Sequence, residues 1–584
     1  MSVCALSLPT RASVQFYLPL PVICAALILL SSPYRSVPTI LVSATKVQSF
    51  PTCDIVIAGG SLASLAAAMT AANTSHHLNV CLLDITDWPG GQLTASAVPA
   101  VDFGPANKDP RNLPRSFVDM LWSLFPGEEN VGNCWVSTKC FRPSIVLDSW
   151  VFPMLGKLPN LQVFLNTVVT SSALDNLGRV VEISALQRTP KRGVRAWDHL
   201  LSEQLHQWYS MPEHSLFDYT PLSFMSFKVA IDATEFGDLL VTSGVRWAQG
   251  FETPTEMSTS YYTLCGQGVT IPFFMEFLHK EAPRPDPVPK GSGEGLPFTL
   301  RNDTFPHVWS YRRSLARPES TFYTAMAGEV SNQNWGGGND LDNAYVLESW
   351  PQATPVVPWY GGINISALRM AEQRAYGYYH FYKNSSGPKI CDYLIMNGTY
   401  AGTGHGLAKM PYLRDTRRSA AGLDGFRLCY AHLATNQSDC GAAFAGDTLR
   451  DREEDRESKH TQSSSLKSAG GSGTASTPSN APSSRQFLSV GLTPLPTTPS
   501  HSSSLPERTP STSYRFADTI GIGHYFYADI HLMAAQSCPY PSYLVNASGR
   551  PVLPYYLPFR ALTVQESPNL LVAGKTMSQV SVHF

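Results

Sequence analysis

The sequence predicts an α/β fold built on a parallel sheet. Three observations predict it: two short apolar runs typical of strands, a glycine turn directly after the first run, and an Ala/Leu-rich stretch between them. The first run is Asp54–Ala58, the turn is Gly59-Gly60-Ser61, the stretch is Leu62–Ala72 and the second run is Val80–Leu83. A strand, tight turn, helix and strand in this order form one βαβ unit, whose two strands pair in parallel.

Further apolar runs indicate more strands. We expect them at Leu161–Val169, Arg179–Ile183, Phe227–Asp232 and Asn569–Ala573, the last of which ends at Gly574. Residues 250–400 are rich in Trp, Tyr, Pro and Gly at irregular spacing, and we interpret them as a second domain with many loops. Its aromatic side chains could line a substrate cleft, although ordinary packing is the commoner role for any one of them.

Composition excludes two classes of protein. The chain has 584 residues, of which 43% are hydrophobic, so it can bury a large core and is not wholly disordered. Lys+Arg is 43 and Asp+Glu is 45, which gives a net charge of -2. Because no excess of cations can displace counterions from a phosphate backbone, we expect no nucleic-acid partner.

Residues 1–45 resemble a targeting segment. Phe16–Leu30 is largely apolar, but its uninterrupted part, Val22–Leu30, suits a signal peptide and falls short of the roughly 20 residues that span a bilayer. The alternative is an uncleaved signal anchor that holds the protein on a membrane through residues 16–30.

The cysteines and glycosylation sequons favour the secretory pathway, with a secreted or luminal glycoprotein as the product. Cys134 and Cys140 can either close a small loop or remain two buried thiols. No cysteine or histidine cluster has zinc spacing, so no metal site is expected. The seven Asn-x-Ser/Thr sequons are at Asn73, Asn302, Asn364, Asn384, Asn397, Asn436 and Asn546.

Residues 450–513 are predicted to be a disordered insertion. A mixed-charge run leads into a segment dominated by Ser, Thr and Pro, which cannot bury enough apolar surface to offset its ordering entropy. Strand-like sequence resumes after Tyr514, so the insertion interrupts a domain and does not end one.

The first turn carries a degraded dinucleotide-binding motif. Gly59, Ser61 and Ser64 occupy the three positions of G-x-G-x-x-G, in which the backbone approaches a pyrophosphate at a helix N-terminus. A serine hydroxyl at the second position could itself bond a phosphate oxygen. Asp84, at the end of the second strand, stands where the acid that binds a ribose hydroxyl belongs. Alone this signal is weak, because glycine turns after buried strands are common in α/β proteins.

Six further segments strengthen the motif, and they occur in order along the chain. With them, the chain from about Cys53 to Ser578 resembles a family of FAD-dependent oxidoreductases with a glutathione-reductase-like FAD-binding domain, some bacterial members of which are labelled xanthan lyase. The segments are Thr86–Thr94, Cys134–Pro143, Asp232–Leu240, Leu413–Arg418, Ile520–His531 and Asn569–Lys575.

The resemblance implies a domain organisation. A Rossmann-like FAD-binding domain, with a parallel sheet and a β-meander, would be interleaved with an α+β substrate or cap domain. The FAD-binding domain would comprise residues 46–249 and 514–584, the cap residues 250–400, and an FAD-proximal segment residues 401–449.

The resemblance also implies which residues bind FAD. The glycine turn would hold the pyrophosphate, Asp84 the adenosine ribose, and Gly574 would approach the ribityl chain. A Gly-Gly-Gln segment would run beside the diphosphate and flavin, and the turn after the Phe227 strand would pack against the cofactor. Asp238 in that turn is also expected to cap a helix. The full set is Gly59, Gly60, Ser61, Asp84, Gly90, Gly91, Gln92, Thr234, Asp238 and Gly574.

His524, Asp529 and His531 are the candidate catalytic residues. Hydride transfer to flavin usually needs a group that takes the substrate proton, and a histidine suits this role, with an Asp beside it to fix its tautomer. Arg414 and Arg417 could clamp an anionic substrate or balance charge on reduced flavin. The alternative is a structural network between the domains, which we favour for the arginines and leave open for the histidines.

One departure from the family concerns the end of the sequence. The family continues after the last strand into a helix whose N-terminus points at the flavin, whereas here ten residues follow Gly574. We therefore expect the dipole of that helix to be missing.

The expected function is that of an FAD-dependent oxidoreductase acting on a small organic substrate by hydride transfer to flavin. One alternative is a secreted or luminal binding protein on the same scaffold without flavin turnover. Another is a carbohydrate-active lyase-like auxiliary protein, which rests on a family label and on fold alone.

Overall fold

The computed structural model describes fifteen stretches of the chain, all within one compact unit, Ser49–Phe584. The predicted signal segment, the predicted insertion up to residue 512, and His524 and Asp529 lie outside the described residues. The described residues are 52–102, 109–124, 132–136, 139–250, 266–280, 298, 305–322, 324–349, 355, 358–385, 391–429, 432, 513–523, 531 and 554–579.

A six-stranded sheet forms the centre of the unit, in the order β18-β19-β7-β1-β2-β3. Five strands are parallel and β18 is antiparallel, so the predicted α/β class with a parallel sheet is confirmed. Ala58 at the end of β1 pairs with Leu83 of β2 and with Asp232 of β7, so these strands end level with one another. The strands are β1 (Ile55–Ala58), β2 (Val80–Leu83), β3 (Leu161–Phe164), β7 (Val229–Asp232), β18 (Thr563–Val564) and β19 (Ser567–Val572).

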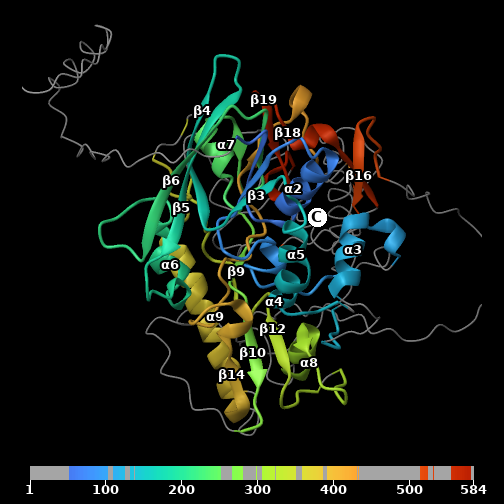
Figure 1. Cartoon of the computed structure of the whole chain (residues 1–584). Helices are drawn as coiled ribbons and strands as arrows, with labels where there is room; N and C mark the ends of the chain where they lie inside the picture. Colours follow the sequence, from blue (N-terminus) through green and yellow to red (C-terminus); the bar gives the residue numbers. More distant parts are fainter. Residues whose placement is uncertain are drawn as a thin grey trace, which may run out of the picture. The chain divides into compact units, whose positions relative to one another are not determined.

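Apolar side chains cover both faces of this sheet, as expected for buried parallel strands. Ile57 and Leu82 face a core made with the helices α2, α3, α4 and α5, whereas Val56 and Leu83 face the other core. Figure 1 shows these helices on one side of the sheet and β4, β5, β6 and α7 on the other. The helices are α2 (Leu62–Thr74), α3 (Arg115–Leu124), α4 (Pro143–Val146), α5 (Phe152–Leu155), α6 (Leu201–Gln204) and α7 (Asp238–Ser243).

The prediction of a single strand over Leu161–Val169 is wrong. The chain leaves the parallel sheet after β3 and enters a second sheet at β4 (Thr167–Leu174), with Asn166 between them at φ 52°. β4, β5 (Val180–Pro190) and β6 (Phe217–Met225) form an antiparallel meander, which matches the expected β-meander. No glycine marked the change of sheet, because Asn tolerates the left-handed region.

The segment predicted to be a cap contains a four-stranded antiparallel sheet in the order β11-β12-β10-β14 and the long helix α9 (Ile365–Ser385). Its strands are β10 (Phe273–Phe277), β11 (Arg313–Leu315), β12 (Val330–Gln333) and β14 (Leu394–Met396), with α8 (Phe305–Tyr311) beside them. Three strand pairs make up the remaining sheets of the described residues: β8 (Trp247–Ala248) with β15 (Arg418–Ser419), β9 (Val269–Thr270) with β13 (Asp340–Leu341), and β16 (Thr519–Gly523) with β17 (Tyr555–Pro558).

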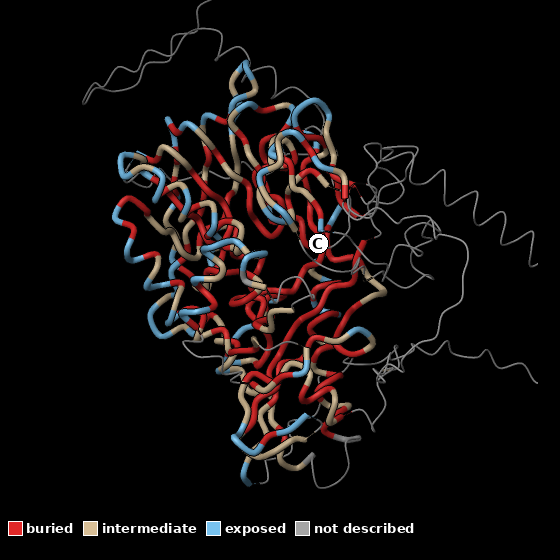
Figure 2. The backbone as a smooth tube through the Cα atoms, turned by 90° about the vertical axis from the view of Figure 1, so that its right-hand side faces the viewer, coloured by how far each residue is buried: buried red, intermediate tan, exposed pale blue. Residues whose placement is uncertain are grey.

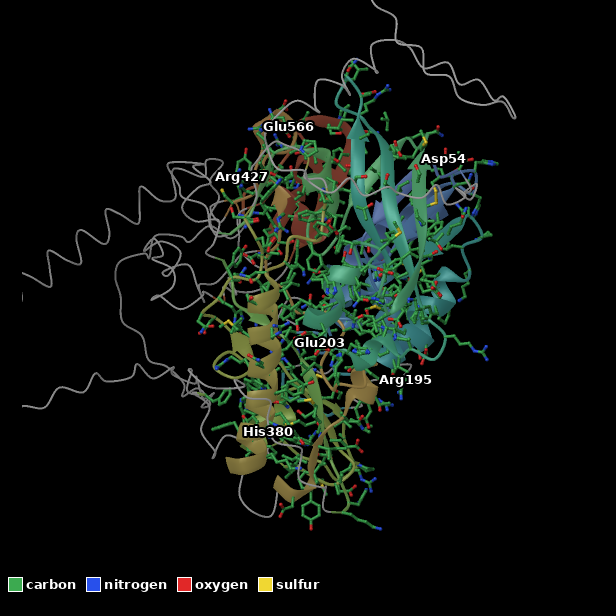
Figure 3. All side chains as sticks on the ribbon, turned by 90° about the vertical axis from the view of Figure 1, so that its left-hand side faces the viewer. Asp54, Arg195, Glu203, His380, Arg427 and Glu566 are labelled. Carbon is green, nitrogen blue, oxygen red and sulfur yellow. A yellow bond between two sulfur atoms is a disulfide. The ribbon has the colours of Figure 1, made fainter. Side chains whose placement is uncertain are left out.

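One continuous apolar core links the parallel sheet, the meander and α9, and includes Val56, Leu222 and Leu368. Figure 2 shows buried backbone through the middle of the unit and exposed loops around it. The exact limits of the predicted domains stay a prediction. In Figure 3, Asp54, directly before β1, lies near the top of the view, whereas Arg195 and Glu203 lie lower down.

Two disulfides join residues within the described part of the chain. Cys134–Cys140 closes the small loop that the spacing allowed, and Cys53–Cys81 ties the segment before β1 to β2. None of the helices among the described residues has the length and apolar character needed to cross a membrane.

Candidate functional site

A cavity of about 300 Å³ lies at the carboxyl ends of three adjacent parallel strands. Ser61–Ala63 follow β1, Ala233–Glu235 follow β7, and Gly574–Lys575 follow β19. In the sheet, β2 pairs with one edge of β1, and β7, which comes later in the chain, pairs with the other edge. The strand order reverses at this point, and ligands of open α/β sheets bind where it does so. The rest of the wall is Gln92, Gln267, Arg414, Asp415, Thr416, Arg418, Tyr555, Leu557, Met577 and Gln579.

The N-terminus of α2 forms one wall of the cavity. Ser61 caps the helix by accepting a hydrogen bond at Oγ from Ser64 N, at 3.3 Å, and the same hydroxyl donates to Ala233 O at 3.1 Å. Leu62 and Ala63 also line the cavity, and first-turn amides have no intrahelical acceptor. The helix start therefore offers N–H groups and a positive dipole to an anion. A bond from the Ser61 hydroxyl to phosphate stays a prediction, since that proton is donated to Ala233.

The two glycines of the turn are required by close packing. Gly59 has φ 113°, and a Cβ there would lie 2.1 Å from Ala233 O, so only glycine lets the end of β1 approach β7. A Cβ on Gly60 would lie 1.8 Å from Asp84 Oδ2. The second glycine therefore makes room for the carboxylate at the end of β2.

Asp84 is buried against that turn. Its Oδ1 accepts hydrogen bonds from Thr86 N at 2.7 Å and Thr86 Oγ1 at 3.1 Å, whereas Oδ2 has no hydrogen-bond partner within the described part of the chain. Burial raises the pKa of Asp84 to about 7, although the bonds from Thr86 favour the charged form. A buried carboxylate oxygen without a donor has the chemistry that a ribose hydroxyl needs, but Asp84 does not line the cavity, so its assignment to the ribose stays a prediction.

The Gly90-Gly91-Gln92 segment lies across the start of α2. Gly90 and Gly91 both have positive φ, at 119° and 51°, and Gly90 N donates to Gly60 O at 2.7 Å. A Cβ on Gly91 would lie 2.9 Å from the Cα of Ser61, and Gln92 lines the cavity. The segment's place beside the diphosphate and flavin stays a prediction.

The turn after β7 contributes Thr234 to the cavity, and Thr234 N and Oγ1 both donate to Asp232 Oδ1. The expectation that Asp238 caps the following helix is wrong. Gly237 holds the cap position, Asp238 is the first residue of α7, and Asp232 Oδ2 accepts the bond from Leu240 N at 2.9 Å.

The carboxylate of Asp238 does not line the cavity. Its Oδ1 accepts hydrogen bonds from Tyr209 Oη and Trp359 Nε1, and burial raises its pKa to about 7. Asp238 lines a separate void of about 10 Å³ next to Thr167–Val169. Its assignment to the cofactor stays a prediction.

Gly574 brings the end of β19 to the same place. Its φ is 70°, and a Cβ would lie 3.0 Å from the Cβ of Ala63 at the start of α2. The next residue, Lys575, places Nζ 2.6 Å from Glu235 Oε2 and 2.8 Å from Leu413 O. The sequence reasoning missed this ion pair on the cavity wall, because its members are 340 residues apart.

His531 is the one candidate catalytic residue that the structure describes. Its Nδ1 lies 3.5 Å from Asp340 Oδ2, and Arg414 Nη2 lies 3.1 Å from both oxygens of the same carboxylate. Burial acts to raise the pKa of Asp340, but Arg414, His531 and Thr270 outweigh it and hold the pKa well below its usual value. Because Arg414 lines the cavity, the imidazole is tied to the cavity wall through Asp340.

Arg417 has the structural role that we favoured for the arginines. It is fully buried and donates to the carbonyls of Phe236, Glu348 and Gly362 at 2.7 to 3.0 Å. A guanidinium committed to backbone carbonyls holds the segment beside the cavity in place.

Residues 54–197 match the model of a family described as FAD dependent oxidoreductase. The match confirms the resemblance over this part of the chain and identifies FAD as its cofactor, and it gives no support to the xanthan lyase label. The match spans β1, α2, β2 and the start of the meander, which include the glycine turn and Asp84.

No curated protein matches the sequence. Among solved structures, L-proline dehydrogenase from P. horikoshii is 15% identical, over 35% of this chain and 24% of that chain, with a TM-score of 0.15. The p-nitrophenol 4-monooxygenase PnpA from Pseudomonas putida DLL-E4 is 9% identical over 39% and 47%, with a TM-score of 0.20. E. coli quinol fumarate reductase FrdA is 13% identical over 47% of each chain, with a TM-score of 0.19. This chain spans less than half of each, and likenesses this weak carry no argument about it.

Proposed function

We propose that the chain is an FAD-dependent oxidoreductase that transfers hydride between a small organic substrate and the flavin. The observation that carries the proposal is the meeting of three backbone features at one cavity. They are the start of α2 after β1, the Gly90–Gln92 segment after β2, which lines the cavity through Gln92, and Gly574 after β19, all at the carboxyl ends of strands of the parallel sheet. The family match over residues 54–197 supports FAD as the cofactor.

The residues present fit the dinucleotide part of FAD. The amides at the start of α2 would hold the pyrophosphate, since they offer donors and a positive dipole. Asp84 would accept a ribose hydroxyl at Oδ2, and Gly90–Gln92 would run beside the diphosphate. The bound flavin would supply the hydride acceptor, while the protein supplies binding, orientation and proton transfer.

We propose His531 as the group that moves the substrate proton. Asp340 would hold its Nδ1 and fix the tautomer of the imidazole, and the His531 side chain is 32% exposed and therefore accessible. Asp340 thereby takes, for this histidine, the role that the sequence suggested for Asp529. His524 and Asp529 lie outside the described residues and keep their predicted roles.

An anaerobic substrate screen on the flavin-loaded chain tests this proposal. Small alcohols, amines, and hydroxy and amino acids would be mixed with the protein while the yellow flavin band is recorded. We expect one class to bleach the band, and we expect His531→Asn to keep FAD but bleach at least 100-fold more slowly, the usual contribution of a positioned acid or base. A chain that binds FAD but is reduced by no substrate would favour the binding-protein alternative.

We also propose that the chain enters the secretory pathway. The two disulfides support this, because disulfides persist in oxidising compartments. Asn73 and Asn364, which head two of the sequons, are exposed. Expression in eukaryotic cells should yield a band that shifts on treatment with an N-glycosidase. A reduced, unglycosylated chain that stays in the cytosol would contradict the proposal.

A further inference from the structure

We propose that Lys409 is a positioning residue for the cofactor, which anchors the loop after β2 to the segment that ends at residue 411. This loop, residues 84–96, carries Asp84 at its start and the Gly90–Gln92 segment in its middle. We call it the β2 loop. The inference rests on the proposed function, since it concerns the side of the loop turned away from the cofactor.

The ammonium of Lys409 is enclosed by three side chains. Nζ lies 2.9 and 3.3 Å from the two oxygens of Asp87, 4.7 Å from the ring centroid of Trp88 and 4.0 Å from that of Trp197. Trp197 Nε1 also donates to Asp87 Oδ2 at 3.1 Å. The Lys409 side chain is only 2% exposed, so the ion pair and both cation–π contacts are shielded from water.

Other contacts also hold the β2 loop against the segment that ends at residue 411. Met410 N donates to Ala95 O at 3.0 Å, and Ser96 Oγ donates to Pro411 O at 3.3 Å. A Cβ on Gly402 would lie 2.2 Å from the Trp88 ring, so glycine is needed there for the indole to fit. Two of these contacts involve the backbone and hold whatever residue stands at position 409. The ion pair and cation–π contacts of Lys409, by contrast, depend on the positive charge of its side chain.

Stability alone does not explain a lysine at this place. Burial lowers the pKa of Lys409 to about 8, although Asp87 favours its charged form. A buried ion pair is often no more stable than apolar residues of similar volume, and what it can supply is one defined arrangement. The Asp87 side chain is 35% exposed, so water can solvate its charge when Lys409 is replaced. Lys409 is therefore expected to determine the placement of the β2 loop more than the free energy of unfolding.

The test is FAD affinity of the apo chain, measured by quenching of flavin fluorescence. Lys409→Met should weaken FAD binding at least tenfold, or about 1.4 kcal/mol, while the midpoint of urea unfolding of the apo chain stays unchanged. Lys409→Arg, which keeps the cation, should stay within threefold of wild type. Lys383→Met is the matched control, because Lys383 is also buried but donates to Leu394 O in the cap.

A double-mutant cycle with Asp87→Asn tests whether Lys409 acts on FAD affinity through this ion pair. The losses of FAD affinity from Lys409→Met and Asp87→Asn should be strongly non-additive, since either change removes the same ion pair. Equal FAD affinities for Lys409→Met and Lys383→Met would overturn the inference. So would a loss of affinity that only follows a loss of stability. Failure of the wild-type chain to bind FAD would instead overturn the proposed function, and the inference with it.

Discussion

Replacing Asp84 by Asn should stabilise the apo chain at pH 8. The ordinary pKa of an aspartate is 3.8, and burial raises that of Asp84 to about 7. At 1.36 kcal/mol for each unit of pKa, keeping this buried carboxylate ionised above pH 7 costs about 4 kcal/mol of folding free energy. Asn removes the charge and keeps an oxygen that can accept the bonds from Thr86, so it should recover most of that cost.

The stability gained from Asp84→Asn should depend on pH, because the pKa of Asp84 is raised in the folded chain. Because the folded pKa is raised, the folded chain binds the proton more tightly, and stability from this group is lost as pH rises from about 4 to about 7. The gain from Asp84→Asn should therefore fall from about 4 kcal/mol at pH 8 to about 2 kcal/mol at pH 5. Urea unfolding of both apo proteins at the two pH values, with disulfides intact, measures it.

The same substitution should weaken FAD binding. A hydrogen bond to a charged acceptor contributes about 1.5 to 3 kcal/mol, so the affinity at pH 8 should fall roughly 10- to 100-fold. An Asp84→Asn chain that is less stable than wild type at pH 8, or a gain that is the same at both pH values, would refute the reasoning about the buried charge. Unchanged FAD affinity would refute the ribose assignment.

Three further predictions concern the scaffold. Gly59→Ala should destabilise the apo chain by more than about 3 kcal/mol through clash and backbone strain. Gly193→Ala, at φ 80° with open space around its Cβ, should cost about 1 kcal/mol. Similar losses of unfolding free energy for the two variants in urea would contradict this. Replacing Cys53 and Cys81 together by Ala should cost about 3.5 kcal/mol, from the chain entropy of a loop with sequence separation 28, and unchanged stability would contradict it. Arg417→Met should cost about 3 kcal/mol or more, because the buried carbonyls of Phe236 and Glu348 lose their donor, while FAD affinity of the folded protein stays the same. Lost affinity at full stability would instead indicate an anion clamp.

The parallel sheet could be predicted because its signals are local. β1, β2, β7 and β19 are short apolar runs that end at glycine or polar turns, and β2 spans the residues expected for it. The glycine turn and Asp84 also lie close in sequence to the strands that position them. The change of sheet at Asn166 was missed, because a left-handed Asn makes the turn without a glycine to mark it.

Much of the site could not be predicted, because it is assembled from distant segments. Asp340 meets His531 and Arg414 across 74 or more residues, and Lys409 reaches Asp87 across 322. No periodicity or motif links such positions in one sequence. The predicted cap role of Asp238 was wrong for a related reason. Asp232, at the end of β7, accepts the hydrogen bond from the Leu240 amide of α7 in its place.

The central claim is that the cavity at the ends of β1, β7 and β19 holds FAD. The most direct test is the absorbance spectrum of the purified chain, from about Thr45 onward, before and after acid precipitation. We predict flavin bands in the native protein that pass into the supernatant with acid, which corresponds to FAD held without a covalent bond. A colourless, folded chain that takes up no FAD on reconstitution would contradict the claim.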